Sequence, residues 1–552
     1  MKGIKRILKK LINNDLLLVI AFSLIFYSII IARNGIVYSV NDDITLRGIV
    51  SGIYLGTPSI DMIFSVFPFS TLLFLLYKIT DIIDWYGLIL ILSNMFFLSY
   101  TIYNIIKIQK EIFKKVVCIG IIFFILSILF LGFLVEITFT TTATFIATCC
   151  LMLYLLPNKS KLKNAIIIIG IVLSYGIRPK ACLMELVFFI PAALYRNINN
   201  RENLKGDFLL GVKIFIALLI CVMVGKTNMR EPQWKEYLEY NNYRSLYYDY
   251  YFKQVRKLPK EERKEIFNKA GFSNKEMNAL DSWSSGMGFY DSIPSKMPLL
   301  IEQFEEHGLK INPNIKGTIG KLLRKGINAY YMVVVFTICY IFFKASDKKI
   351  KFIKICPFAV LQAGILLYLI LQGRIPDRVI IPLYFSYIVM NLFIILNEEE
   401  VKIIIQKVLN NKKKLITICA IILFVVSTQN VNIYTCKKEE ILEENKILKY
   451  FQENPEKFYI FDRNGSEMYS LINKYPAKNY INKNGWTTFS PLHAEKINNQ
   501  GADSLKDLLF KDNVYLVLDS EDTKNYKKLD KNVKIKKIDQ VNNYHIYKIT
   551  KK

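Results

Sequence analysis

Histidine is scarce in this chain: only three of its 552 residues are histidines. His307, His493 and His545 lie far apart, so none of them has the short spacing that metal-binding histidines usually show. The sequence therefore does not indicate a histidine-based metal centre. No metal ligand or cofactor is assigned, and dependence on a divalent metal stays open.

Disulfide patterns and internal repeats are missing as well. The nine cysteines give no disulfide framework: eight fall within apolar runs and Cys436 lies just beyond one, which is typical of small core residues. No segment of the chain repeats another. That absence argues against a transporter built from two repeated halves, because many transporters have that architecture.

Acidic residues are few in comparison with basic ones. The chain has 46 Asp and Glu against 73 Lys and Arg, and its formal net charge is +27. Such an excess can indicate a nucleic-acid partner. Here the basic residues gather in short links between apolar runs, where they set the orientation of a membrane protein. Nucleic acid is therefore not expected as a partner.

Long apolar runs are abundant, and 52% of the residues are hydrophobic. These runs reach roughly 20 residues with few charges, which is enough to cross a hydrocarbon core of about 30 Å as a helix. The chain is therefore predicted to be an α-helical integral membrane protein with about eleven transmembrane helices. We expect spans near residues 15–33, 86–106, 115–135, 139–156, 163–177, 180–195, 207–225, 327–344, 351–371, 378–396 and 414–430.

The basic residues also predict the orientation in the plasma membrane. Lys2, Lys5, Arg6, Lys9 and Lys10 precede the first span, which places the N-terminus in the cytoplasm. The later basic links fall on that same side only if the number of spans is odd. The C-terminus is then extracellular. The first apolar run is long and lacks a small-residue cleavage site, so it is interpreted as a retained anchor.

The segment "SIDMIFSVFPFSTLLFLLYKI" (residues 59–79) is long enough to cross the membrane, but crossing would place every later basic link outside. It also contains Pro68 near its middle and Asp61 near its start. We interpret it as a helix that lies in the outer interface or re-enters against the bundle.

The chain divides into a polytopic membrane domain, residues 1–430, and a C-terminal domain, residues 431–552. The membrane domain has a first external loop with interfacial helices at 34–85 and a large external loop at 226–326. Short β-type runs alternate with helical stretches after residue 431, which predicts an extracellular α/β domain. The tyrosines of residues 237–252 favour an aromatic belt at the membrane surface over a sugar-stacking platform.

Two adjacent carboxylates, Asp42 and Asp43, stand in "SVNDDITLRG" at the entrance of the first external loop. An acidic pair after a span is often a loop with an Asx turn or a helix cap. A carboxylate at this position is also suited to take a proton from an attacking hydroxyl. The sequence alone leaves both interpretations open.

Positive charges occur in two outer turns that otherwise carry few. Arg178 and Lys180 lie in "SYGIRPKACL", and Arg374 and Arg378 lie in "QGRIPDRVI". An arginine at the end of a span is usually an interfacial anchor, but its planar fork also binds phosphate oxygens. Glu136, in "EITFTTTAT", lies in a third outer turn. Carboxylates and cations are thus expected at the same rim of the bundle.

The stretch "NDDITLRGIVSGIYLGTP…VFPFSTLLFLLYKITDIIDWYG" resembles the opening of the GT-C superfamily over about 50 residues. These polytopic glycosyltransferases use polyprenyl- or dolichyl-phosphate sugars. The order of spans, large outer loop and outer C-terminal domain resembles the uncharacterised Gram-positive members. Many members have Asp-Glu or Glu-Asp in the first loop, whereas this chain has Asp-Asp after an Asn.

The resemblance implies that the catalytic base is Asp42 or Asp43. It also implies a donor phosphate held by Arg178 and by Arg374 or Arg378, with Lys180 assisting. Supporting roles are expected for two further carboxylates, Glu136 and Asp61.

The leading hypothesis is an inverting membrane glycosyltransferase. It transfers a sugar from a polyprenyl-phosphate donor to a cell-envelope polysaccharide, teichoic acid or glycolipid on the outer face. The main alternative is a transporter or flippase of lipid-linked saccharides. Transporters usually have polar or broken helices at mid-membrane, whereas the charges noted in this sequence lie at the outer ends. A third alternative is a non-enzymatic cell-surface assembly protein.

Overall fold

The computed structural model describes most of the chain. The described residues are 13–107, 109–156, 160–199, 204–225, 228–281, 287–311, 315–326, 348–373, 375–396, 433–462, 469–470, 476–483, 485–519, 523, 526 and 533–551. The predicted spans at 327–344 and 414–430, and Arg374, lie outside these residues.

A bundle of apolar helices forms the larger part of the described structure. Among the described residues, six helical segments are long and apolar enough to cross a membrane. They are α2 (Asp15–Asn34), α5 (Trp85–Ile106), α10 with α11 (Pro179–Leu186 and Phe189–Asn199), α12 (Leu204–Val224), α20 (Lys348–Leu371) and α21 (Asp377–Leu396). The chain is therefore a helical protein with the features of a multi-pass membrane protein.

Other predicted spans correspond to shorter or interrupted helices. They are α6 (Ile112–Leu129), α7 (Leu131–Val135), α8 (Phe139–Leu155) and α9 (Lys161–Ile177). Helix α8 is buried along its whole length, because α5, α9, α10 and α21 all pack against it. It starts with a capping box in which Thr138 and Thr141 exchange hydrogen bonds. The threonine run therefore supports the start of the central helix.

The first loop, between α2 and α5, contains strand β1 (Val37–Tyr38), helix α3 (Asn41–Ser51) and helix α4 (Phe69–Ile79). Of the stretch 59–79, only the 11 residues of α4 are helical, which gives about 16 Å at 1.5 Å per residue. This is too short to cross a hydrocarbon core of about 30 Å as a helix.

Residues before α4 pack on the end of α9. The Ser65 hydroxyl donates to the Ile177 carbonyl at 2.8 Å, and the Val66 amide donates to the Gly176 carbonyl at 2.8 Å. A Cβ atom on Gly176 would lie 2.9 Å from the Phe69 nitrogen, so glycine permits the close approach. The first loop is thus held against the turn that contains Arg178.

The large loop folds into a helical layer of its own. Its longer helices are α13 (Pro232–Leu246), α15 (Lys260–Lys269), α16 (Asn274–Asp281) and α17 (Ile293–Glu306), and a π-helical turn, η3 (Tyr247–Tyr251), follows α13. Tyr237, Tyr240, Tyr247 and Tyr251 are buried, and Tyr247 stacks on Phe304 at a centroid distance of 5.9 Å. These four tyrosines form part of a core, so the expectation of an aromatic belt is wrong for them.

The C-terminal part contains a five-stranded sheet with the order β5-β3-β6-β8-β7. Strands β5, β3 and β6 are parallel, and β8 joins β6 and β7 in antiparallel fashion. One face packs against α24, and the other packs against α25 and α26. The elements are α24 (Ile433–Glu453), β3 (Phe458–Asp462), β5 (Tyr480–Asn482), α25 (Pro491–Asn498), α26 (Leu505–Leu509), β6 (Val514–Leu518), β7 (Val533–Val541) and β8 (Tyr544–Lys551).

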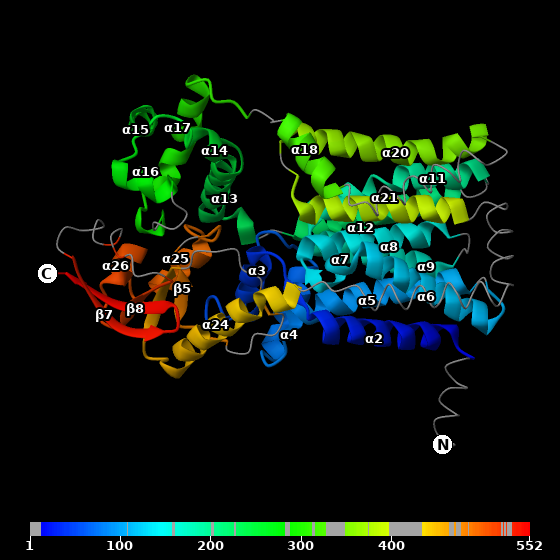
Figure 1. Cartoon of the computed structure of the whole chain (residues 1–552), viewed down its shortest axis with the longest axis horizontal. Helices are drawn as coiled ribbons and strands as arrows, with labels where there is room; N and C mark the ends of the chain where they lie inside the picture. Colours follow the sequence, from blue (N-terminus) through cyan, green and yellow to red (C-terminus); the bar gives the residue numbers. More distant parts are fainter. Residues whose placement is uncertain are drawn as a thin grey trace, which may run out of the picture.

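Figure 1 shows the large-loop helices and the C-terminal sheet at one end of the helical bundle, next to α3 and α4. Helix α2 begins at the opposite end. The large-loop helices, the C-terminal sheet and the first loop therefore meet at the same end of the bundle, and Asp42 and Asp43, in the first turn of α3, lie at this end.

Candidate functional site

A small three-stranded sheet joins distant parts of the chain beside the acidic pair. Strand β1 pairs in parallel with β2 (Glu136–Ile137), which precedes α8, and antiparallel with β4 (Tyr469–Ser470) of the C-terminal part. Helix α3 starts three residues after β1. The pairing therefore fixes the first turn of α3, with Asp42 and Asp43, relative to both α8 and the C-terminal part.

Asp43 is fully buried and connects three helices. Its Oδ1 atom accepts hydrogen bonds from the Tyr86 hydroxyl of α5 and the Phe139 amide of α8, each at 2.8 Å. Its Oδ2 atom has no partner among the described residues. Burial raises the pKa of the Asp43 carboxyl group to about 8. The side chain thus anchors α3 on the bundle.

Asp42 has a different environment, although it is the next residue. Its Oδ2 atom forms an ion pair with Nη1 of Arg378, which belongs to the first turn of α21, at 2.9 Å. The two side chains are 16% and 26% exposed, respectively. Asp42 is therefore the member of the acidic pair that can be reached from solvent.

Arg178 occupies the break between α9 and α10. Its guanidinium group lies over the rings of Phe64 and Phe139, with centroid distances of 4.7 and 4.9 Å. It interacts electrostatically with Arg378, Asp42 and Asp43. Phe139 thus has two roles, because its amide binds Asp43 and its ring supports Arg178. Two carboxyl groups and two guanidinium groups from three separate segments gather at this end of the bundle.

The other candidate residues have different positions. Glu136 lies on β2 and is half-buried; burial and the negative charge of Asp377 raise its pKa. Lys180 is exposed and forms no ion pair in the described part of the chain, so it does not join the cluster. Asp61 accepts from the Ser59 hydroxyl at 3.2 Å and lines a separate pocket. The described residues contain no group of three His, Cys, Asp or Glu side chains that could hold a metal ion.

A partly buried ion pair, formed by a residue one turn after Asp43 on α3, was not expected from the sequence. Arg47 of α3 contacts Asp84 at 3.2 Å, and the Tyr77 hydroxyl donates to the other oxygen of Asp84 at 3.0 Å. The Arg47 guanidinium group also lies over the ring of Tyr38. The only signal in the sequence was one arginine in "DDITLRG", four residues after Asp43, on the same face of a helix.

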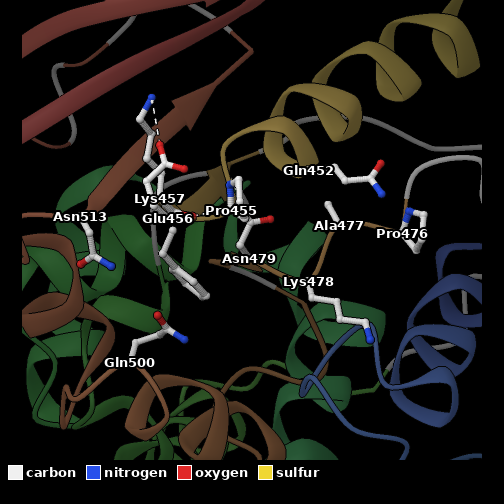
Figure 2. Close-up of a pocket in the computed structure, with 11 residues that line it drawn as sticks. Gln452, Pro455, Glu456, Lys457, Pro476, Ala477, Lys478, Asn479, Gln500 and Asn513 are labelled. Atoms are coloured by element: carbon white, nitrogen blue, oxygen red, sulfur yellow. Dashed lines mark hydrogen bonds and ion pairs between the residues drawn. The ribbon is translucent and has the colours of Figure 1, made fainter.

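Two pockets lie apart from the acidic pair. One has a volume of about 220 Å³ and separates the segment around Asp61 from the end of α12. The other, shown in Figure 2, has a volume of about 370 Å³ and lies in the C-terminal part beside the start of β3. Its amide side chains include Gln452, Gln500 and Asn513, whereas the Asn479 amide binds the carbonyls of residues 451, 454 and 457.

Comparison with protein-family models, with curated proteins and with solved structures gives no match for this chain. The evidence for a function therefore comes from the geometry of the site.

Replacing Asp43 by asparagine is expected to flatten the pH dependence of stability. The folded-state pKa is about 8, whereas an unfolded aspartate has a pKa of about 3.9. Between these values the folded protein retains a proton that the unfolded chain releases. Stability therefore falls as pH rises, by up to about 1.4 kcal/mol per pH unit for this group. Asparagine preserves the acceptor oxygen for Tyr86 and Phe139 but does not titrate.

The measurement is thermal unfolding in detergent from about pH 5 to about pH 8. The wild-type Tm should decrease more steeply over this range than that of Asp43→Asn. The exposed Asp503 provides a control, since Asp503→Asn should leave the slope unchanged. Equal slopes for wild type and Asp43→Asn would contradict the assignment of a protonated Asp43.

Proposed function

We propose that this protein is an inverting membrane glycosyltransferase that uses a polyprenyl-phosphate sugar as its donor. The acceptor is a hydroxyl group of a cell-envelope glycan or glycolipid on the outer face. One observation carries the proposal: the half-buried carboxylate of Asp42 is paired with Arg378, beside the half-buried Arg178, where the bundle meets the soluble parts. This set offers a base for a hydroxyl group and cations for a phosphate.

In this proposal Asp42 is the general base. It accepts the proton of the acceptor hydroxyl as the oxygen attacks the anomeric carbon, and the bond between that carbon and the donor phosphate breaks. Asp43 is a positioning residue, because its Oδ1 atom already holds Tyr86 and Phe139. The carboxyl group that remains accessible is better suited to proton transfer.

Arg178 and Arg378 bind the departing polyprenyl phosphate. Guanidinium groups bind phosphate oxygens through two parallel hydrogen bonds and keep their charge when partly buried. A phosphate competes with Asp42 for Arg378, since both are anions and the ion pair is only 2.9 Å long. Donor binding therefore draws Arg378 toward the phosphate and leaves the Asp42 carboxylate free to accept a proton.

The proposal includes eleven spans, a cytoplasmic N-terminus and extracellular soluble parts. Basic links follow α5, α8 and α11 in the sequence. After α5, Lys115 pairs with Asp15 in the first turn of α2, at the end of the bundle away from the first loop. By the charge rule for cytoplasmic loops, that end faces the cytoplasm. The candidate site then faces the outside, where lipid-linked sugars meet the envelope glycan.

A transporter of lipid-linked saccharides is the second candidate, and Glu185 is the observation that favours it. Glu185 lies on α10 and is fully buried, next to Thr148 of α8 and Ser386 of α21. The two hydroxyls lie 2.6 Å apart, and neither oxygen of Glu185 has a hydrogen-bond partner of ordinary geometry among the described residues. An ionisable group inside a membrane bundle is costly and usually functional.

One experiment separates the two functions. The purified protein is incubated in detergent, and separately in proteoliposomes, with polyprenyl-phosphate hexoses. A glycosyltransferase releases polyprenyl phosphate in detergent when an envelope-glycan extract is added. A transporter releases none but moves the intact lipid-linked sugar between the leaflets of the proteoliposomes. Movement without release would refute the proposed enzyme.

A further inference from the structure

The segment "GWTTFS" (residues 485–490) lies where three parts of the protein meet. The Trp486 ring packs on Phe64 of the first loop at a centroid distance of 4.9 Å. The Tyr237 hydroxyl of the large loop donates to the Trp486 carbonyl, and the Tyr240 ring meets Phe489 edge to face at 5.4 Å. Since Phe64 also supports Arg178, this segment lies one side chain away from the charged cluster.

Two residues of this segment have a positive φ, and the one that is not glycine is strained. Gly485 has a φ of +130° and Phe489 has a φ of +65°. A bulky residue such as phenylalanine rarely adopts a positive φ, because its Cβ atom crowds the backbone. Such strain is retained where the surroundings impose it, and it concentrates at ligand-binding and switching segments.

Three buried polar atoms in and just after the segment have no hydrogen-bond partner among the described residues. They are the indole Nε1 of Trp486, the Oγ1 of Thr488 and the Nε2 of His493, which is on α25. The three residues are between 0% and 6% exposed. Buried polar groups are nearly always hydrogen-bonded, so three exceptions within eight residues indicate partners that a bound molecule supplies.

The three groups are suited to an uncharged, hydroxyl-rich ligand. Burial lowers the pKa of His493 to about 4, so its imidazole is neutral near pH 7. An indole N–H only donates, whereas a hydroxyl and a neutral imidazole can each donate or accept. Sugar hydroxyls complement such a set, and an aromatic ring next to them provides an apolar surface for a sugar ring.

We propose that residues 485–493 form the subsite that binds the acceptor's sugar, with Trp486 Nε1, Thr488 Oγ1 and His493 Nε2 hydrogen-bonded to its hydroxyl groups. This inference rests on the proposed function. Because the three atoms are buried, the sugar enters as the strained segment moves away from Phe64 and Tyr240. The acceptor hydroxyl then lies between this segment and the cluster that contains Asp42.

The test measures sugar binding directly, without a donor lipid. Saturation-transfer NMR is recorded for the full-length protein in detergent with glucose, galactose, mannose, rhamnose and N-acetylglucosamine, each offered separately. Trp486→Phe preserves an aromatic ring but removes the N–H group, and Thr488→Val removes the hydroxyl group at similar volume. Each is expected to weaken binding of the preferred sugar by about 3- to 10-fold, the effect of one lost hydrogen bond.

Two control variants locate the binding. Trp234→Phe changes a buried tryptophan of α13 and should bind sugar as the wild type does. Gln500→Ala changes the amide-lined pocket of Figure 2 and should also have no effect. The Tm of every variant is measured, so that loss of binding by an unfolded protein is recognised. If either Trp486→Phe or Thr488→Val fails to fold, the other one still tests the subsite.

The inference is overturned if no sugar binds, if Gln500→Ala alone reduces binding, or if the folded Trp486 and Thr488 variants bind as the wild type does. A different outcome would refute the proposed function instead. In that outcome both substitutions weaken sugar binding as expected, but the protein releases no polyprenyl phosphate from any donor. If the protein releases polyprenyl phosphate but neither substitution changes its sugar binding, the proposed function stands and only the subsite is refuted.

Discussion

Replacing Asp42 by asparagine is expected to lower the rate of sugar transfer by about 100-fold or more while the protein still binds its donor. Asparagine has the shape of aspartate and can accept a hydrogen bond from Arg378, but it cannot take a proton from the acceptor. The chemical step therefore becomes slower. The affinity for the donor does not fall, because asparagine competes less strongly with the phosphate for Arg378 than a carboxylate does. Transfer is measured as release of polyprenyl phosphate at saturating donor.

Two variants serve as comparisons for Asp42→Asn. Asp81→Asn removes an exposed carboxylate from the same loop, between α2 and α5, and should transfer sugar at the wild-type rate. Asp43→Asn should lose less activity than Asp42→Asn, because it retains the hydrogen bonds to Tyr86 and Phe139. If the Asp42→Asn, Asp43→Asn double variant transfers sugar at the wild-type rate, neither carboxylate is the base.

The helices could be predicted from the sequence because hydrophobicity is a local property of the chain. The apolar runs at 86–106 and 139–156 coincide with α5 and α8, within one residue at each end. The segment 59–79 required the charge rule as well, since its composition alone resembles a span. For the two apolar runs the evidence lies within about 20 residues of sequence, whereas the charge rule uses basic links along the whole membrane domain.

The site depended on contacts that no local pattern predicts. Asp42 and Asp43 were equivalent in the sequence, and they differ only because Tyr86 and Phe139 close over one of them while Arg378, 336 residues away, pairs with the other. The pairing of β1 with β4 uses two residues on each strand. Such a short strand has no recognisable period.

Glu185 was overlooked for a similar reason. It is one charged residue in an apolar stretch near Arg178, and nothing in the sequence distinguishes a carboxyl group at the helix surface from one inside the bundle. Its burial follows from the packing of α8 and α21 against α10. The sequence predicted the turn in "SYGIRPKACL", but it did not predict that the Glu185 side chain of the following helix points into the bundle.

Replacing Arg178 by glutamine is expected to weaken donor binding by about 10- to 100-fold, the usual effect of losing a charge-assisted hydrogen bond to a phosphate. Glutamine retains a planar polar end but has no charge. The rings of Phe64 and Phe139 hold the guanidinium group in place, so little side-chain entropy is lost when it binds. Donor affinity is measured by competition with free polyprenyl phosphate.

Lys180→Gln removes a positive charge two residues further along and provides the matched control. Lys180 is exposed and outside the cluster, so its loss should change donor affinity less than twofold, within the range of a screened surface charge. Arg178→Lys should recover only part of the affinity, since an ammonium group cannot form two parallel hydrogen bonds with the phosphate. Equal losses for Arg178→Gln and Lys180→Gln would mean that the rim attracts the donor only by its net charge. In that case the position of Arg178 between its two rings would have no specific role in holding the phosphate.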